Sequence, residues 1–197
     1  MVYEMHPINK LRKLNIPAIL LALAWLITSP VVAEEVYLIR GYGDVFSAGM
    51  NQMTSRLKKS GVKASVLSSG QWRGIARDII RRKKDGKVSH PIVIVGHSLG
   101  GVEAPLFANT LAKGGVKVAL VIGLDPGFKE PAPFGPNIKQ VINYKIPSGQ
   151  NYRRGRGFKG SLVTIDVSKY GVDHVGIDKN QKVQHQVMSR IRRKVRK

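Results

Sequence analysis

The chain has 197 residues and carries 33 lysines and arginines against 12 aspartates and glutamates, a formal net charge of +21 at pH 7. This length, with 43% hydrophobic residues, suits one globular domain with a substantial core. The chain has no cysteine, which excludes disulfide bonds, thiolate catalysis and cysteine-ligated metal sites. The positive charge exceeds what solubility requires and predicts an anionic partner.

The first 33 residues have the pattern of a secretory signal peptide. Basic residues within 10–13 precede an apolar run at 16–27, and small residues lead up to Ala33. The pattern predicts cleavage after Ala33 and a secreted or periplasmic domain over residues 34–197. An uncleaved membrane anchor is the alternative, but the apolar run is shorter than the roughly 20 residues that span a bilayer.

The chain after Ala33 begins with alternating strand and helix patterns. Strands are predicted at 36–39 and 62–67, and helices at 45–59 and 72–82. The first strand ends in Arg40-Gly41-Tyr42-Gly43, whose glycines allow a tight turn at the edge of a sheet. Basic residues cover one side of the second helix, and such charge runs are more often a solvated face than a binding surface.

A strand, a glycine-rich turn and a helix follow. Ile92–Val95 has no polar position, which is typical of a strand buried on both faces of a parallel sheet. Gly96-His97-Ser98-Leu99-Gly100 then matches G-x-S-x-G, a nucleophile elbow in which side chains at the two glycines would crowd the backbone. Ser98 precedes a helix predicted at 102–113, whose N-terminal amides favour developing negative charge. The alternative is a turn whose serine only caps the helix.

The alternation continues through the second half of the chain. Further strands are predicted at 116–124, 140–146 and 162–167, and a basic helix at 183–195 closes the chain. The pattern predicts a doubly wound α/β fold with a mainly parallel sheet, whose functional groups gather at the carboxyl ends of the strands. Gly41, Ser98 and Asp125 all fall at such ends, and His174 lies in the turn before the last helix.

With Ser98, Asp125 and His174 in that order, residues 36–190 resemble the α/β-hydrolase superfamily, and within it the small lipase- and esterase-like members. Three segments carry the resemblance: GHSLGG at Gly96–Gly101 is similar to the lipase elbow, GLDP at Gly123–Pro126 to the acid segment of the pancreatic-lipase family, and DHVG at Asp173–Gly176 to the loop of the catalytic histidine. The resemblance implies a single minimal hydrolase domain. A chain this short leaves little or no room for a cap.

The resemblance also implies the roles of the site residues. Ser98 would attack an acyl carbonyl, His174 would accept its proton and return it to the leaving group, and Asp125 would orient the imidazole. The backbone amides of Leu99 and Tyr42 would form the oxyanion hole. No metal or cofactor is expected, because the chain has no zinc-ligand spacing, P-loop or dinucleotide fingerprint.

The acid and the histidine each have alternatives. Asp125 follows an earlier strand than is usual in the superfamily, and Asp173 and Asp166 are its substitutes. Asp173 adjoins His174, and neighbouring side chains rarely face each other, while Asp166 lies inside a predicted strand. The other four histidines fall in the leader, before the elbow strand, in the elbow and in the last helix. The family's usual His-Gly before the oxyanion loop appears here as Arg40-Gly41.

We therefore expect a serine hydrolase that cleaves carboxylic esters through an acyl-enzyme and takes a small ester or lipid as its substrate. An acyl-thioester hydrolase is one alternative, because the same triad serves both leaving groups. A catalytically idle hydrolase fold that binds anionic polymers or membrane surfaces is another, because a fold does not settle an activity.

Two basic segments bear on partners. The tail Arg190–Lys197 predicts attraction to an anionic membrane surface or polysaccharide. The arginines of 153–156 lie between Tyr152 and Phe158, a composition that also occurs in nucleic-acid-binding loops, but a solvated loop or a contact with an anionic substrate is favoured. A nucleic-acid partner is not expected, and the sequence carries no signal for an oligomeric state.

Overall fold

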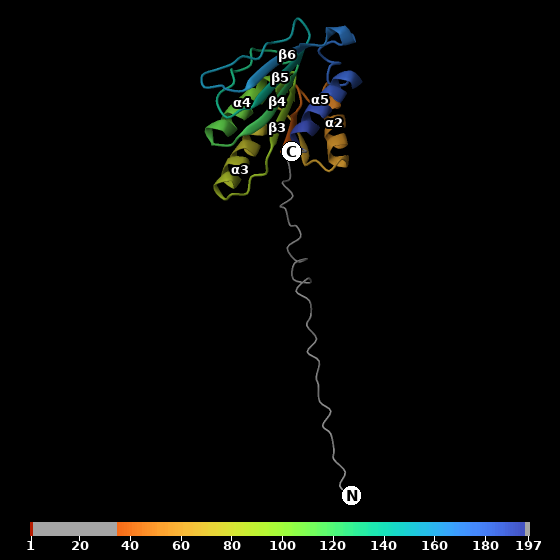
Figure 1. Ribbon diagram of the computed structural model, residues 1–197. Helices are drawn as coiled ribbons and strands as arrows, with labels where there is room; N and C mark the ends of the chain where they lie inside the picture. The colour runs from red at the N-terminus through yellow and green to blue at the C-terminus, as the bar shows by residue number, and fades with distance from the viewer. Residues whose placement is uncertain (2–34, 196–197) are drawn as a thin grey trace. The chain divides into compact units, whose positions relative to one another are not determined.

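The computed structural model describes Met1 and residues 35–195, and from residue 35 onward these form one compact unit. A single sheet of six parallel strands has the order β2-β1-β3-β4-β5-β6 (Figure 1). The strands are β1 (Glu35–Ile39), β2 (Ala64–Leu67), β3 (Ile92–His97), β4 (Val118–Leu124), β5 (Gln140–Lys145) and β6 (Ser161–Asp166). This all-parallel sheet confirms the predicted doubly wound α/β fold.

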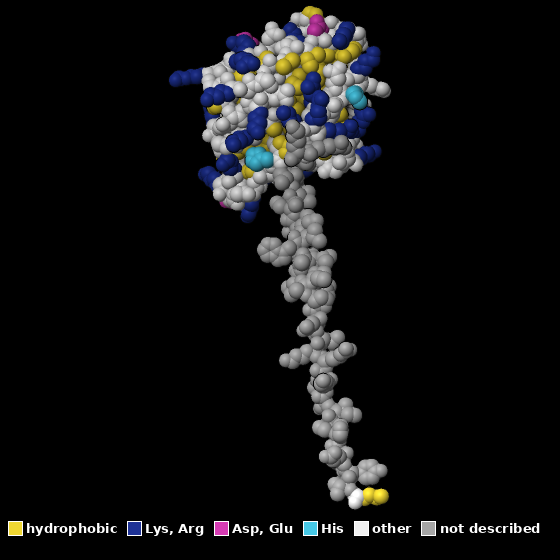
Figure 2. Space-filling view, viewed as in Figure 1, with side chains coloured by type: hydrophobic (Ala, Val, Ile, Leu, Met, Phe, Trp, Pro, Cys, Tyr) yellow, Lys and Arg dark blue, Asp and Glu magenta, His cyan; other side chains and the backbone are white. Residues whose placement is uncertain are grey.

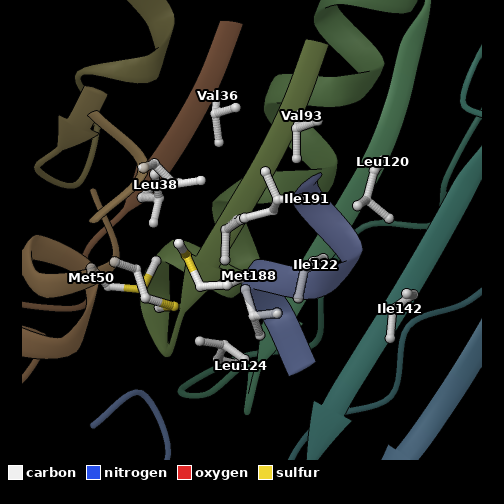
Figure 3. Close-up of a cluster of buried hydrophobic side chains, with 14 of the residues drawn as sticks. Val36, Leu38, Met50, Val93, Leu120, Ile122, Leu124, Ile142, Met188 and Ile191 are labelled. Carbon is white, nitrogen blue, oxygen red and sulfur yellow. The ribbon is translucent and has the colours of Figure 1, made fainter. Parts of the chain in front are cut away.

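Helices cover both faces of the sheet, α3 and α4 on one face and α2 and α5 on the other (Figure 1). They are α2 (Ala48–Lys59), α3 (Trp72–Lys84), α4 (Leu99–Lys113) and α5 (Gln181–Val195), with the short 3-10 helix η2 (Ser168–Tyr170) before α5. Because side chains alternate along a strand, Leu38 of β1 faces α2 and α5, while Ile39 faces α3 and α4. Figure 3 shows the first of these cores, where Met188 of α5 packs over the strands.

Two helices begin at places that the sequence pattern did not indicate. α2 begins at Ala48 and not at Val45, because Ser47 accepts a hydrogen bond from the Gly41 amide and holds the preceding residues in a turn. α4 begins at Leu99, earlier than predicted, because the turn at Ser98 leads directly into the helix. Both differences lie beside the predicted elbow serine.

A proline inside α4 is accommodated by a tyrosine from a distant loop. Pro105 has no N–H with which to bond the Gly101 carbonyl four residues earlier. The Tyr152 hydroxyl donates to that carbonyl at 2.7 Å, and burial raises the pKa of Tyr152. The Tyr152 ring also packs edge-on against Phe134, with centroids 5.0 Å apart. Tyr152 is therefore a core residue, with no face available for stacking on nucleic acid.

The predicted signal peptide, its cleavage site after Ala33 and the last two residues of the basic tail lie outside the described residues. The signal peptide, export and the domain boundary stay predictions. Within the described part of the chain, no helix combines the length and apolar character needed to cross a bilayer.

Candidate active site

Ser98 occupies a strained turn between β3 and α4. Its backbone has φ 55° and ψ −121°, a conformation that residues other than glycine rarely adopt. A Cβ at Gly96 would overlap the Gly100 carbonyl, and a Cβ at Gly100 would overlap the Ile39 carbonyl. The two glycines are thus required for the tight crossing of backbone that places Ser98 at the N-terminus of α4.

Ser98, His174 and Asp125 form one chain of hydrogen bonds. The Ser98 Oγ lies 2.8 Å from the His174 Nε2, and the His174 Nδ1 lies 2.6 Å from the Asp125 Oδ2. The second carboxylate oxygen of Asp125 accepts the Ile146 amide at 3.1 Å. Asp125 is 1% exposed, while the His174 side chain is 37% exposed and so reachable from solvent.

The parallel register explains why these side chains meet. His97 of β3 pairs with Leu124 of β4, so that Ser98 and Asp125 leave the sheet side by side at the same edge. His174 reaches them from the turn between η2 and α5. A hydroxyl, an imidazole and a buried carboxylate in this order can activate an oxygen nucleophile.

The two substitute carboxylates are engaged elsewhere. The Asp173 Oδ1 accepts the Gly176 amide at 2.6 Å and so closes the turn that carries His174. The Asp166 Oδ1 accepts the Ser168 amide at 2.8 Å at the start of η2. Asp125 is therefore the carboxylate that the fold brings to His174.

The predicted oxyanion-hole residues border Ser98 on two sides. Leu99 follows Ser98 as the first residue of α4. The turn before Tyr42 lies against Ser98, because a Cβ built on Gly41 would stand 3.0 Å from the Ser98 Cβ. Arg40 holds this turn through an ion pair of 3.1 Å with Asp44.

His97 links this turn to the loop that carries His174, a role that no sequence pattern indicates. Its Nε2 lies 2.9 Å from the His174 carbonyl oxygen, which can only accept, so Nε2 carries the proton. The other nitrogen, Nδ1, then accepts from the Ser47 hydroxyl at 2.8 Å, and Ser47 itself accepts the Gly41 amide at 2.8 Å. A continuous buried network thus joins Gly41, beside Ser98, to His174.

Asp178 lies beside this network as an isolated buried carboxylate. It is fully buried, and neither of its oxygens has a hydrogen-bond partner of good geometry within the described residues. Burial raises its pKa, an effect that His97, Lys179 and the amides of Gly49 and Met50 at the start of α2 partly offset. Burial also lowers the pKa of His97.

Asp178→Asn is expected to stabilise the protein at about pH 8 and to change its stability little at about pH 3. Because the folded state raises the pKa of Asp178, ionising this carboxyl destabilises the fold as the pH rises from the unfolded value through the raised pKa. Asparagine has a similar shape and no charge to desolvate. The difference in free energy of unfolding between the variant and the parent should therefore grow with pH to about 1 kcal/mol or more. Urea unfolding at several pH values measures it, and a gap that shrinks as the pH rises would contradict the expectation.

Comparison with known proteins finds a match to one family model and similarity in fold to solved structures. Residues 28–122 match the lipase (class 3) family, a segment that contains Ser98 and ends before Asp125 and His174. A solved structure of RedJ with a PEG molecule bound in the active site is 11% identical, with a TM-score of 0.50 over 81% of this chain and 91% of that chain. The NocB thioesterase domain in covalent complex with a fluorophosphonate nocardicin G analogue is 12% identical, with a TM-score of 0.47 over 82% and 94%. No significant match was found among curated proteins.

Proposed function

We propose that this chain belongs to the α/β-hydrolase superfamily and is a serine hydrolase that cleaves carboxylic esters through an acyl-enzyme. The observation that carries the proposal is the chain of hydrogen bonds from Ser98 through His174 to Asp125. The match of residues 28–122 to a lipase family supports an ester substrate. In the described residues no group of histidines and carboxylates is arranged to hold a metal ion.

The chemistry follows from the geometry of the three side chains. The Ser98 Oγ attacks the acyl carbonyl carbon as its proton passes to the His174 Nε2, 2.8 Å away. His174 then donates that proton to the leaving alkoxide, and the acyl group stays on Ser98. A water molecule, deprotonated by His174, releases the acid. The buried Asp125 carboxylate holds the Nδ1–H and stabilises the imidazolium in both steps.

The oxyanion of each tetrahedral intermediate would be bound by the amides of Leu99 and Tyr42. The Leu99 amide belongs to the first turn of α4, where the helix dipole adds to its effect. Because Ser47 occupies the Gly41 amide, the next amide along the turn, that of Tyr42, is the one we assign to the oxyanion. The hydrogen-bond network through His97 would hold this turn and His174 in fixed positions relative to each other.

Exposed apolar side chains beside Ser98 support a substrate with an apolar acyl or alcohol group. Tyr42 and Phe128 are 73% and 75% exposed, and their rings lie 6.2 Å apart. The Phe128 ring also meets His174 edge-on at 6.4 Å, and Val45 and Phe46 extend the exposed surface next to Tyr42. Apolar side chains gathered at a reactive site favour binding of an apolar group.

Phe128→Ala is expected to raise KM about tenfold for a hexanoate ester while changing KM for the acetate ester much less. The longer acyl chain would contact the Phe128 ring, and acetate would not reach it. Val163→Ala, which removes an exposed apolar side chain from β6, is the matched control. Initial rates with p-nitrophenyl esters measure the effect. An equal change for both esters would show that Phe128 does not contact the acyl chain.

A pair of substrates with the same butyryl group, one an oxygen ester and one a thioester, tests the reaction class. We expect kcat/KM to be higher for the oxygen ester with the purified chain. A higher kcat/KM for the thioester would assign the protein to acyl-thioester hydrolysis, and no turnover of either would indicate an idle hydrolase fold.

A further inference from the structure

A row of lysines lies along the edge where the strands begin, which we call the basal edge. Lys117 and Lys139 directly precede β4 and β5, and Lys159 lies just before β6. These three strands are neighbours in the parallel sheet, about 5 Å apart, so residues distant in sequence stand side by side. The candidate active site lies at the opposite edge, where the strands end.

The helices bring further basic residues to the basal edge. Each of α2, α3 and α4 returns the chain from the end of one strand to the start of the next, and α5 runs back after β6. Their last turns are basic, with Arg56, Lys58 and Lys59 in α2, Arg81, Arg82, Lys83 and Lys84 in α3, Lys113 in α4, and Arg192, Arg193 and Lys194 in α5. The basal edge is therefore strongly cationic.

Two adjoining hollows open on the basal edge and share Lys117 and Lys139. One, of about 450 Å³, is also lined by Lys159, and the other, of about 570 Å³, by Lys83 and Lys194. No carboxylate is among the described residues that line either hollow. Figure 2 shows lysine and arginine side chains spread over the viewed face with few acidic ones among them.

The histidine in the larger hollow reports the local charge. Burial lowers the pKa of His90, and the charges of Lys83 and Lys117 lower it further, against an opposing effect of Glu35. Glu35 is the nearby carboxylate, and Arg82 holds it with two hydrogen bonds of 2.7 and 2.9 Å. The positive potential in the hollow is thus only partly neutralised from within the domain.

Glu35 and Asp85 lie at the basal edge, where basic residues outnumber them, and more of the acidic residues lie toward the other edge of the sheet. Those at or near the strand ends include Asp44, Asp125, Asp166, Asp173 and Asp178. The domain therefore has a cationic basal edge and an opposite edge, with both acidic and basic side chains, that carries the candidate active site. An anionic surface would bind such a domain in one preferred orientation.

We propose that the basal edge docks on an anionic phospholipid bilayer, with the lysines of the two hollows binding lipid phosphates. Glu35, the first residue of β1, lies at this edge, directly after a segment whose sequence predicts a cleaved secretory signal peptide. No phenylalanine, tyrosine or tryptophan is among the described lining residues of either hollow, whereas single-stranded nucleic acid is bound with aromatic stacking. The docked domain presents Ser98 away from the bilayer. The proposal does not depend on catalytic activity.

Reversing the charge of the three lysines that precede strands tests the proposal. The variant Lys117→Glu, Lys139→Glu, Lys159→Glu is compared with a control of equal charge change toward the opposite edge, Lys145→Glu, Lys169→Glu, Lys179→Glu. All proteins are full chains and share residues 1–34. Cosedimentation uses vesicles of phosphatidylcholine with about 30 mol % phosphatidylglycerol, and vesicles of phosphatidylcholine alone, across a salt series.

We expect the basal variant to lose about 100-fold or more in affinity for the anionic vesicles, since each basic residue near such a surface contributes roughly fivefold. The control variant should keep most of the affinity, and high salt should reduce binding of the parent to the level of the basal variant. Equal loss in both variants, or equal binding of the parent to both kinds of vesicle, would overturn the proposal. So would salt-sensitive binding to a nucleic-acid duplex without binding to anionic vesicles.

Discussion

Ser98→Ala is expected to lower kcat for short p-nitrophenyl esters by on the order of 10⁶, to the background left by the oxyanion hole and substrate binding. Alanine keeps the size and backbone preferences of the position but has no oxygen to attack the acyl carbonyl. The Ser98 Oγ forms a hydrogen bond with His174 at the end of the hydrogen-bond chain, so its removal should leave the fold intact. Initial rates of parent and variant at equal concentration measure the effect.

Ser168→Ala, an exposed serine in η2, serves as the control for this substitution and should have the parent's activity. Circular dichroism and the unfolding midpoint of the Ser98 variant check that its fold is intact. Activity within tenfold of the parent in a folded Ser98→Ala protein would show that Ser98 is not the nucleophile.

Asp125→Asn is expected to lower kcat by roughly 10⁴ with little change in KM. The side-chain amide can still accept the Ile146 N–H, but its NH₂ group would face the His174 Nδ1 and favour the tautomer with the proton on Nε2. That tautomer cannot accept the Ser98 proton. The same assay measures kcat and KM separately.

Asp173→Asn is the matched control for the acid. The side-chain carbonyl of the substituted residue could still accept the Gly176 amide, so the turn should persist and kcat should change less than about tenfold. If Asp173→Asn instead caused the larger loss, the acid would have to be reassigned to Asp173 despite the hydrogen bond between His174 and Asp125.

The sheet and the elbow are predictable from the sequence because both depend on local patterns. Ile92–Val95 is a continuous β-branched run, and such runs fit a strand buried on both faces. The two glycines around Ser98 have a steric cause within a few residues of chain. The placement of Asp125 at a strand end can also be predicted from the sequence, because the apolar run before it stops there.

The hydrogen-bond network from Gly41 through Ser47 and His97 to His174 cannot be predicted from the sequence. Ser47 and His97 are 50 residues apart, and their hydrogen bond depends on the register of β1 against β3. Asp178 follows an apolar residue, and nothing in the neighbouring sequence predicts that its side chain is fully buried against the start of α2. The periodicity predicts a helix from Val45, but that pattern cannot show that a hydrogen bond to Gly41 holds the chain in a turn.

The gathering of basic residues at the basal edge likewise cannot be predicted from the sequence alone. The tail Arg190–Lys197 stands out in the sequence because its basic residues are close together. Lys117, Lys139 and Lys159 are about equally spaced along the chain, and only the parallel order of β4, β5 and β6 gathers them. The basic residues 192–194 of the tail, in the last turn of α5, are therefore one part of a larger cationic edge.

Labelling with a fluorophosphonate probe tests the central claim most directly, because this reagent reacts with a serine only when a neighbouring base activates it. The full chain is incubated with the probe, digested, and analysed by mass spectrometry to locate the adduct. We expect one adduct, on Ser98, which is absent after heat denaturation and forms far more slowly in Asp125→Asn. No adduct on the folded protein, or an adduct on another serine, would contradict it.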